Sequence, residues 1–384
     1  MLAPSSALPL PPRPSLERYR KLAKELLKAF KAGTIGAWAR QSNEVEEFAR
    51  HELSGKCSLT KAQFVIARSH GFESWPKFAK HLEALAKNSP VSRFEAAADA
   101  IASGDLRTLK RLLREDPKLI RAKSTREHGA MLLHYVGANG VENYRQRTPK
   151  NIVEITETLL NAGAEIDATA SLYGGGHTTL ALASTSIHPV RAGVLEELLQ
   201  LLLDRGASLE RASVFACLAN GRPQGAEFLV RRGARLDWRE AAGMGRLDIV
   251  KERFDEASVD ERKEGFVYAC EYGRNDVVEF LLGKDVDLAG QIAHGQTGLH
   301  MAVIGGQLET VKLLLRHNPP LEVKNRYGGT VLGQALWSGA HGGDPDVTNA
   351  IMEALIGAGA QIDGTRLLNA GKLDSDPHGR ESSR

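Results

Sequence analysis

The stretch Thr297–Lys324 reads TGLHMAVIGGQLETVKLLLRHNPPLEVK and predicts two short helices joined by a turn. The hydroxyl of Thr297 can cap the first helix, and Gly306 ends it. Leucine and valine then recur at helical spacing in a second helix. That helix stops before Pro319, because proline has no backbone N–H to donate. A helix pair of this size cannot bury its apolar face alone, so the chain must supply further pairs that stack on it.

The end of this unit recurs along the chain. Related endings are LLNAGAEID (159–167), LLDRGASLE (202–210), LVRRGARLD (229–237), LLLRHNPPLE (313–322) and LIGAGAQID (355–363). Five such endings in register indicate tandem repeats. The start of the unit, TGLHMA (297–302), resembles the T-P-L-H-x-A signature of ankyrin repeats, with Gly298 in place of proline. The resemblance implies an all-α ankyrin-repeat solenoid, in which helix pairs with short hairpin loops stack in a row.

The pattern of helices and turns divides the chain into four parts. We expect a disordered Pro-rich tail (1–15), a helical N-terminal block (16–90), a solenoid of about eight units (91–363) and a mostly disordered, polar tail without a repeat pattern (364–384). The helices predicted in the N-terminal block cover 16–33, 34–52, 59–69 and 74–85. Residues 59–85 resemble a helical segment that precedes ankyrin arrays in uncharacterised bacterial proteins.

Three units carry extra residues between their first and second helices, at 137–150, 184–191 and 338–346. Insertions at one structural position map to one side of a solenoid. Two of them fall in adjacent units, so they could form a shared ridge. The alternative is loop growth that an exposed edge tolerates without any function. The sequence leaves both interpretations open.

The composition restricts the class of protein. The net charge of +3 is too small to indicate nucleic-acid binding for the chain as a whole. Cys57, Cys217 and Cys270 are odd in number and far apart, which argues against a disulfide framework and suits a reducing compartment. No run of about 18 apolar residues is present, so we expect no transmembrane helix, and the start is a poor signal peptide. We therefore expect a cytoplasmic protein.

The candidate chemical motifs favour structural roles. In the ankyrin family the motif histidine, here His134 and His300, bonds backbone groups and fixes the turn between repeats. No HExxH spacing places two ring nitrogens on one metal. The glycine clusters at 174–176 and 342–343 lack the GK[ST] or GxGxxG context of a phosphate loop. We expect no catalytic residue, no metal and no cofactor.

The N-terminal block offers a rival function. Gln63, Ala67 and Gly71 have the spacing of a DNA-binding helix-turn-helix, with the next helix as the recognition helix. Residues 1–90 hold 15 Lys/Arg and 8 Asp/Glu, a local excess of +7. Against this, we expect Trp75 and Phe78 on that helix to pack into the core, where they could not contact DNA. The other interpretation is a helical bundle that covers the bare face of the first repeat.

An ankyrin array binds its partner through hairpin tips and first helices, so motif positions that the fold leaves free are the candidate contacts. The leading function is therefore non-catalytic binding of another protein, as a monomeric scaffold or adaptor. The alternatives are nucleic-acid binding or transcriptional regulation through the N-terminal block, and an enzyme whose pocket the inserted loops form. The candidate partner-binding residues are Leu172, Tyr173, His177, Leu182, Gln296, Met301, Ile304, Lys324, Arg326, Tyr327, Gln334 and Trp337.

Overall fold

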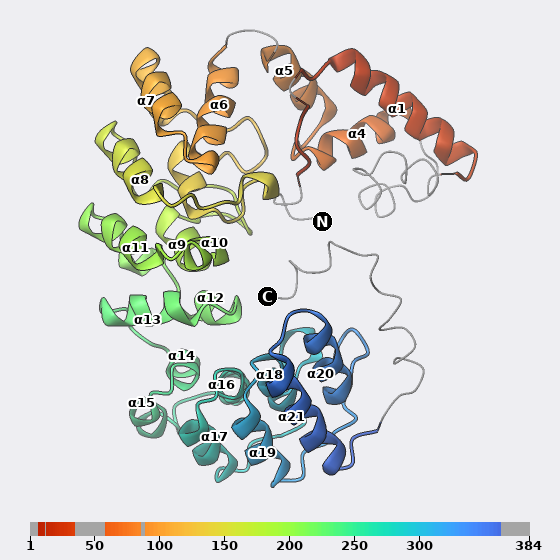
Figure 1. Cartoon of the computed structure of the whole chain (residues 1–384), viewed down its shortest axis with the longest axis vertical. Helices are drawn as coiled ribbons and strands as arrows, with labels where there is room; N and C mark the ends of the chain where they lie inside the picture. Colours follow the sequence, from red (N-terminus) through yellow and green to blue (C-terminus); the bar gives the residue numbers. More distant parts are fainter. Residues whose placement is uncertain (1–6, 12, 35–57, 86–88, 362–384) are drawn as a thin grey trace. The chain divides into compact units, whose positions relative to one another are not determined.

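The computed structural model describes residues 7–11, 13–34, 58–85 and 89–361, and these residues form helices and loops (Figure 1). The described residues contain no strand, only two isolated β-bridges between loops. The chain divides into two compact units, residues 1–213 and 214–384. The helix expected at 34–52 lies almost entirely outside the described residues, and so do Cys57 and the polar C-terminal tail.

The N-terminal block supplies three described helices, α1 (Leu16–Lys31), α4 (Leu59–Ser69) and α5 (Trp75–Leu85). These bounds confirm the predictions for 16–33, 59–69 and 74–85. The hydroxyl of Ser58 caps α4 by accepting the backbone N–H of Lys61 at 3.2 Å. The apolar faces of the three helices meet in one core that includes Leu26, Ile66 and Phe78. Apolar residues recur every three to four positions in these helices, and this explains why one face of each helix is buried.

Three helix pairs follow in the first unit, and consecutive pairs are in contact. They are α6 (Pro90–Ser103) with α7 (Leu106–Glu115), η3 (Leu132–Gly137) with α8 (Ile152–Asn161), and α9 (Thr179–Ser184) with α11 (Leu195–Asp204). Shorter helices lie between them: η2 (Pro117–Arg121), η4 (Asn143–Arg145), α10 (Ile187–Arg191) and η5 (Leu209–Arg211).

The N-terminal helices join these pairs directly. α5 contacts α6, the carbonyl of Gly71 accepts the N–H of Glu127 at 3.0 Å, and His81 Nδ1 lies 2.7 Å from the hydroxyl of Thr125. The compact unit therefore extends through residue 213, across the boundary that the sequence analysis places at residue 90.

Five helix pairs form the second unit. They are α12 (Val214–Ala219) with α13 (Pro223–Arg231), α14 (Trp238–Gly243) with α15 (Leu247–Glu252), α16 (Val259–Glu271) with α17 (Asn275–Leu282), α18 (Gly298–Ile304) with α19 (Leu308–Leu315), and α20 (Val331–Ala340) with α21 (Pro345–Gly357). A short η6 (Ala293–Gly295) precedes α18. Each first helix contacts the next first helix, and α15, α17, α19 and α21 contact one another in the same order.

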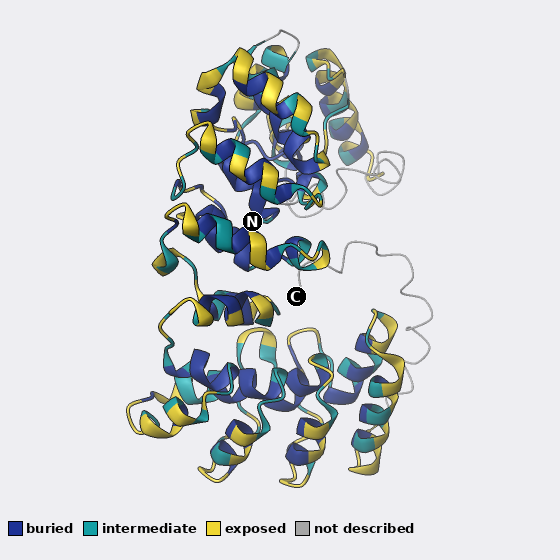
Figure 2. Ribbon diagram, turned by 60° about the vertical axis from the view of Figure 1, so that its left-hand side comes forward, coloured by how far each residue is buried: buried dark blue, intermediate teal, exposed yellow. Residues whose placement is uncertain are grey.

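Most helices turn one face toward their neighbours and the other toward solvent, as the burial colours show (Figure 2), whereas all of α9 and all of α18 except Ile304 are buried. The two helices predicted within Thr297–Lys324 are confirmed as α18 and α19, and the Thr297 hydroxyl accepts the N–H of His300 as the predicted cap. Cys217 and Cys270 are buried. Among the described helices, none combines the length and the apolar character needed to cross a membrane.

Candidate functional site

An exposed surface forms where two loops of the second unit meet, one before α18 and one before α20. We call the side chains of His294, Lys324, Arg326 and Tyr327 the tip surface. All four are exposed, and the exposed fraction of Tyr327 is 61%. Sequence analysis identified three of them, and His294 is the addition.

A buried asparagine fixes the second loop. Asn325 Oδ1 accepts the backbone N–H groups of Tyr327 at 3.0 Å and of Gly329 at 2.9 Å, and its own N–H donates to the carbonyl of Gly329 at 2.9 Å. An asparagine that bonds backbone groups two and four residues ahead acts as a local turn. Lys324 and Arg326 flank this buried residue, so both point out of a loop that is internally bonded.

The two loops are tied to each other edge to edge. The N–H of Arg326 donates to the carbonyl of His294 at 2.7 Å, and Gln291 Nε2 donates to the carbonyl of Lys324 at 3.1 Å. The ring of Tyr327 stacks on the ring of His294, with centroids 6.0 Å apart and planes 20° apart. The two loops that carry the tip surface are therefore held together by hydrogen bonds and ring stacking within the chain itself.

The motif histidine explains the position of the second loop. His300 Nδ1 lies 2.9 Å from the Thr297 hydroxyl, and Nε2 donates to the carbonyl of Gly329 at 3.2 Å. Burial lowers the pKa of His300, so the neutral ring is favoured. His134 bonds backbone in the same way, accepting from the N–H of Met131 at 3.1 Å and donating to the carbonyl of Ala168 at 3.0 Å. The structural role predicted for both histidines is confirmed.

A second exposed aromatic lies on α20. Trp337 has an exposed fraction of 37%, and its ring stacks on His341 with centroids 4.3 Å apart. His341 Nδ1 also bonds the carbonyl of Trp337 at 2.7 Å, which holds the two rings together. Gln334, one turn earlier, is half-buried, and its Oε1 lies 3.4 Å from Asn325 Nδ2. The fold thus uses part of the hydrogen-bonding capacity of Gln334.

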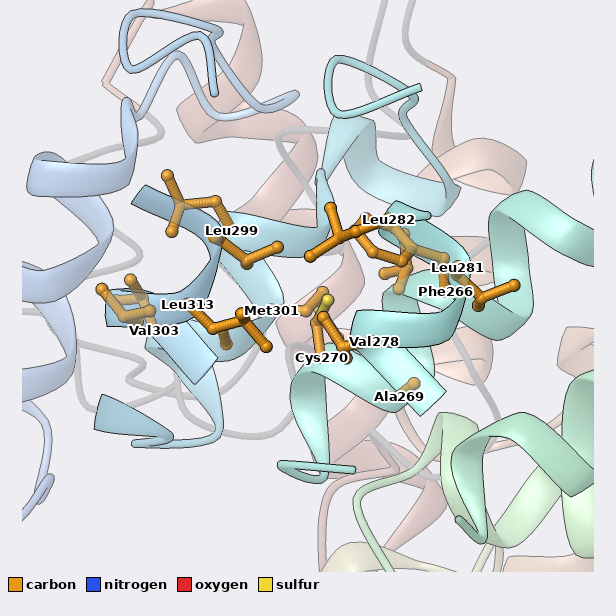
Figure 3. Close-up of a cluster of buried hydrophobic side chains, with 14 of the residues drawn as sticks. Phe266, Ala269, Cys270, Val278, Leu281, Leu282, Leu299, Met301, Val303 and Leu313 are labelled. Carbon is orange, nitrogen blue, oxygen red and sulfur yellow. The ribbon is translucent and has the colours of Figure 1, made fainter. Parts of the chain in front are cut away.

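The structure corrects three of the candidate contact residues. Leu172 is fully buried, Leu182 is 1% exposed and Met301 is 8% exposed. Leu182 lies on α9, which packs against η3, and Met301 lies on α18 between α16 and α20. Leu172 lies in the loop before α9, against the backbone of the first insertion at Gly140. In the second unit Met301 lies next to Cys270 inside the hydrophobic cluster (Figure 3). His177, Gln296 and Ile304 are half-buried.

Tyr173 keeps its exposed position in the first unit, with an exposed fraction of 51%. Its hydroxyl donates to Asn139 Oδ1 at 2.7 Å, and Asn139 Nδ2 donates to the hydroxyl of Thr185 at 2.9 Å. The Ser186 hydroxyl donates to the carbonyl of Ala138 at 3.1 Å. The insertions at 137–150 and 184–191 therefore contact each other.

Much of the first insertion folds inward, which the sequence analysis did not predict. Glu142 is completely buried and Arg145 is 3% exposed. With Glu95 and Arg126 they form what we call the ion network. Arg126 Nη1 lies 2.7 Å from Glu95 Oε1, and Arg126 Nε lies 3.0 Å from Glu142 Oε1. Arg145 Nη1 lies 2.8 Å from Glu95 Oε2.

The electrostatics of the ion network favour the charged forms. Burial opposes ionisation of Glu142, but Arg126 and His128 outweigh it and hold the pKa of this carboxyl well below its usual range. Burial likewise opposes the charge on Arg145, and Glu95 outweighs it, so the pKa of Arg145 is raised. Each carboxylate is thus already engaged by arginine. A clue was available in FEAAADAIA (94–102), where Glu95 and Asp99 interrupt an otherwise apolar stretch.

The ion network adjoins a pocket of about 80 Å³, but the lining does not suit catalysis. The lining residues are Pro90, Val91, Phe94, Glu95, Ala122, Lys123 and Thr125. Its single carboxylate, Glu95, is bound by two arginines and cannot serve as a free base. In the described part of the chain, no three His, Cys, Asp or Glu side chains gather as a metal site.

The surface of α5 does not have the charge that its proposed recognition role requires. Phe78 and Leu82 face the core, as do His81 and, in part, Trp75. The exposed charged side chains of this helix and its preceding turn are Glu73, Lys77, Lys80 and Glu83, two of each sign, and Lys77 and Glu73 form an ion pair. A phosphate-binding face needs an excess of cations.

Comparison with known proteins finds a match to ankyrin repeats within the second unit. Residues 266–365 match a family model described as ankyrin repeats in three copies. "Ankyrin repeat domain-containing protein 13C" of Danio rerio is 39% identical over 71 residues, which is 18% of this chain and 14% of that protein. The human protein of the same name is 49% identical over 43 residues, 11% of this chain and 8% of that protein.

A frog relative, "Ankyrin repeat domain-containing protein 13C-A" of Xenopus laevis, is 48% identical over 44 residues, 12% of this chain and 9% of that protein. The chain thus spans a small fraction of the length of the curated relatives it matches. The matches, together with the stacked helix pairs, confirm the all-α fold with ankyrin repeats. The likeness of residues 59–85 to a segment of bacterial proteins stays a prediction.

Proposed function

We propose, from the premise that residues 266–365 are ankyrin repeats, that this chain binds another protein through the tip surface of its second unit. Ankyrin repeats suggest a module for protein–protein interaction. The finer proposal is a non-catalytic scaffold or adaptor that works as a monomer and engages its partner with His294, Lys324, Arg326 and Tyr327, with Trp337 as a second anchor.

One observation carries the proposal, which is the pre-organised exposure of Tyr327. Its ring is held against His294 and its loop is fixed by Asn325, yet 61% of the side chain is exposed. Tyrosine, tryptophan and arginine are the residue types that most often dominate interface energies. An anchor that is already ordered loses little conformational entropy on binding, which favours affinity.

The charge of the tip surface indicates the chemistry of the partner. Lys324 and Arg326 are exposed, and neither side chain forms an ion pair with any residue that the structure describes. Unpaired cations beside an aromatic ring favour a partner segment that carries carboxylates, because charge complementarity steers association and selects the partner. We therefore propose an acidic segment next to an apolar side chain that covers Tyr327.

The test is affinity capture with the full chain, followed by mass spectrometry of the captured proteins. The double variant Tyr327→Ala/Trp337→Ala should lose a partner that the unmodified chain retains. Glu309→Ala/Lys312→Ala is the control, because this exposed pair lies on α19, away from the loops. Retention of every partner by the aromatic variant would place the binding surface elsewhere.

A further inference from the structure

Helix α1 carries a row of basic side chains on the side that faces solvent. Its buried residues are Tyr19, Ala23, Leu26 and Ala29, which recur every three to four positions and so define one side of the helix. An α-helix turns about 100° per residue, so the opposite side presents a different set of positions. We call the basic residues there the cation stripe, and they are Arg20, Lys21, Lys24, Lys28 and Lys31.

The fold leaves most of the charge of the cation stripe uncompensated. All five side chains are exposed. Lys21 Nζ lies 3.9 Å from Glu25 Oε1, and the exposed fractions of these two side chains are 78% and 47%. The other four form no ion pair with any residue that the structure describes. Glu17 is the second acidic residue of α1, and it lies in the first turn, where a negative charge favours the helix dipole.

A second basic helix of the same unit has different surroundings. α7 carries four exposed basic residues, which are Arg107, Lys110, Arg111 and Arg114. Lys110 Nζ lies 3.4 Å from Glu154 Oε1 of the next helix pair. Arg111 Nη1 lies 3.0 Å from Glu115 Oε2 at the end of α7 itself. Two of the four cations of α7 are thus paired at short distance, whereas the cation stripe has a single long contact.

The apolar side of α1 restricts how a partner can use this surface. That side packs against α4 and α5, so α1 cannot bury its apolar residues in a partner without opening the core. Binding at the cation stripe must therefore act through charge. The stripe extends about 16 Å along the helix axis from Arg20 to Lys31, and a partner that reaches all of it needs an extended anionic surface.

The residue types of the cation stripe favour a lipid surface over a nucleic acid. Four of the five residues are lysines, whose compact charge is strongly hydrated, whereas arginine is the residue of choice for bidentate recognition of nucleic-acid phosphates. The aromatic residues of α1 are Tyr19 and Phe30, and both pack in the core or against it. They are therefore not placed to stack on bases, as single-strand binding proteins require. Clustered basic residues on an amphipathic helix are typical of binding to anionic lipids.

We propose that the cation stripe holds α1 against an anionic lipid surface by charge alone, without insertion of apolar side chains. Each basic residue near such a surface strengthens binding about fivefold, and the attraction decays within the Debye length. The attachment is therefore strong at low salt and weak at high salt. It is independent of the proposed partner-binding surface, because the cation stripe belongs to the first unit and the tip surface to the second.

Co-sedimentation of the full chain with lipid vesicles tests the proposal. Phosphatidylcholine vesicles that contain about one third phosphatidylserine should bind the chain, and vesicles of phosphatidylcholine alone should not. Lys24→Gln/Lys28→Gln/Lys31→Gln should weaken binding to the mixed vesicles about a hundredfold. Glutamine has nearly the helix propensity of lysine, so α1 should persist. The control Arg107→Gln/Arg111→Gln/Arg114→Gln makes the same change in net charge on α7 and should bind as the unmodified chain does.

Four results would overturn the proposal. Equal binding to both kinds of vesicle, or binding to neither, would mean that the chain does not recognise anionic lipid. An equal loss in both triple variants would mean that the vesicles respond to net charge and not to the cation stripe. Duplex DNA that displaces the chain from the mixed vesicles at an equal concentration of phosphate would assign the stripe to nucleic acid. Binding of the unmodified chain that persists at high salt, which needs no variant to measure, would contradict attachment by charge alone.

Discussion

Two arginines in loops of the two units have opposite surroundings. Arg145 lies in the insertion of the first unit, and its guanidinium binds Glu95 and Asp99. Arg326 lies in the loop before α20, exposed, with no ion pair among the described residues. Both are charged loop residues followed within two positions by further polar side chains. The difference lies in what the neighbouring first helix offers to each of them.

For Arg145 that neighbour is α6, which presents Glu95 from a position 50 residues earlier in the chain. A buried arginine needs such a partner, because an uncompensated charge in the interior costs several kcal/mol. No acidic side chain within the described ranges forms an ion pair with Arg326, which is exposed to solvent. A charged loop can therefore serve as a binding surface only where its charged side chains are not already paired inside the fold.

The ion network should be the most sensitive part of the first unit. Glu142→Gln removes the charge that Arg126 faces while it preserves the side-chain shape. Breaking a buried pair leaves the other charge uncompensated, and we expect a loss of about 3–5 kcal/mol in the free energy of unfolding. Urea unfolding, with hydrogen exchange of α6 and η3 to assign the loss to the first unit, measures it.

The matched control is Glu154→Gln, which neutralises a carboxylate of the same unit. Glu154 pairs with Lys110 at 3.4 Å, and both side chains are more than half exposed. Exposed pairs contribute less than about 1 kcal/mol, so this variant should stay close to the unmodified chain. If Glu142→Gln also lost less than about 1 kcal/mol, the ion network would not be a determinant of stability.

Mild acid should destabilise the first unit through two buried histidines. Burial lowers the pKa of His70 and of His81 from 6.5 to about 4. The unfolded chain then binds more protons than the folded chain between pH 6.5 and 4, so stability falls as the pH falls through this window. At pH 5 each histidine should cost about 2 kcal/mol relative to pH 7.

Urea unfolding at the two pH values measures this loss, with hydrogen exchange of α4 and α5 as the local readout. The double variant His70→Gln/His81→Gln should be less stable than the unmodified chain at pH 7 but should show little change between the two pH values. The carboxyl of Glu142 adds its own loss only below pH 4.5, because its folded pKa lies under that value. A histidine variant that keeps the full pH dependence would contradict the assignment.

Local sequence signals predicted the helices well. Thr297 caps α18 as predicted, and Ser58 caps α4 in the same way, because a cap depends only on residues a few positions away. Exposure was harder to predict. Leu172 and Met301 occupy positions that a single repeat leaves open, and the adjacent repeats bury them.

Side-chain exposure was equally hard to predict for the insertion at 137–150. Nothing within its own sequence shows that Glu142 and Arg145 turn inward, since their partners Glu95 and Arg126 come from other elements. By contrast Tyr327 and Trp337 were predicted as surface residues and are exposed. Their role as contacts stays a prediction, which rests on residue type and on the bonding of the loop.

The smallest effect expected is on binding alone. Lys324→Gln/Arg326→Gln removes two exposed charges that no described residue pairs with, so folding stability should change by less than about 0.5 kcal/mol. Affinity for a captured acidic partner should fall about tenfold, and most of the salt dependence of that affinity should disappear. Surface plasmon resonance at low and at physiological ionic strength measures both quantities.

The control carries the same charge change on α19, in Lys312→Gln/Arg316→Gln, where both side chains are exposed. It lowers the net charge of the chain equally, so it isolates the position of the charge from its amount. If the control weakens binding as much as the loop variant, the partner responds to net charge and the tip surface is not the contact. If only the loop variant loses affinity, the charge of Arg326 contributes to binding. Arg145 cannot contribute in this way, because its charge is already paired with Glu95 and Asp99.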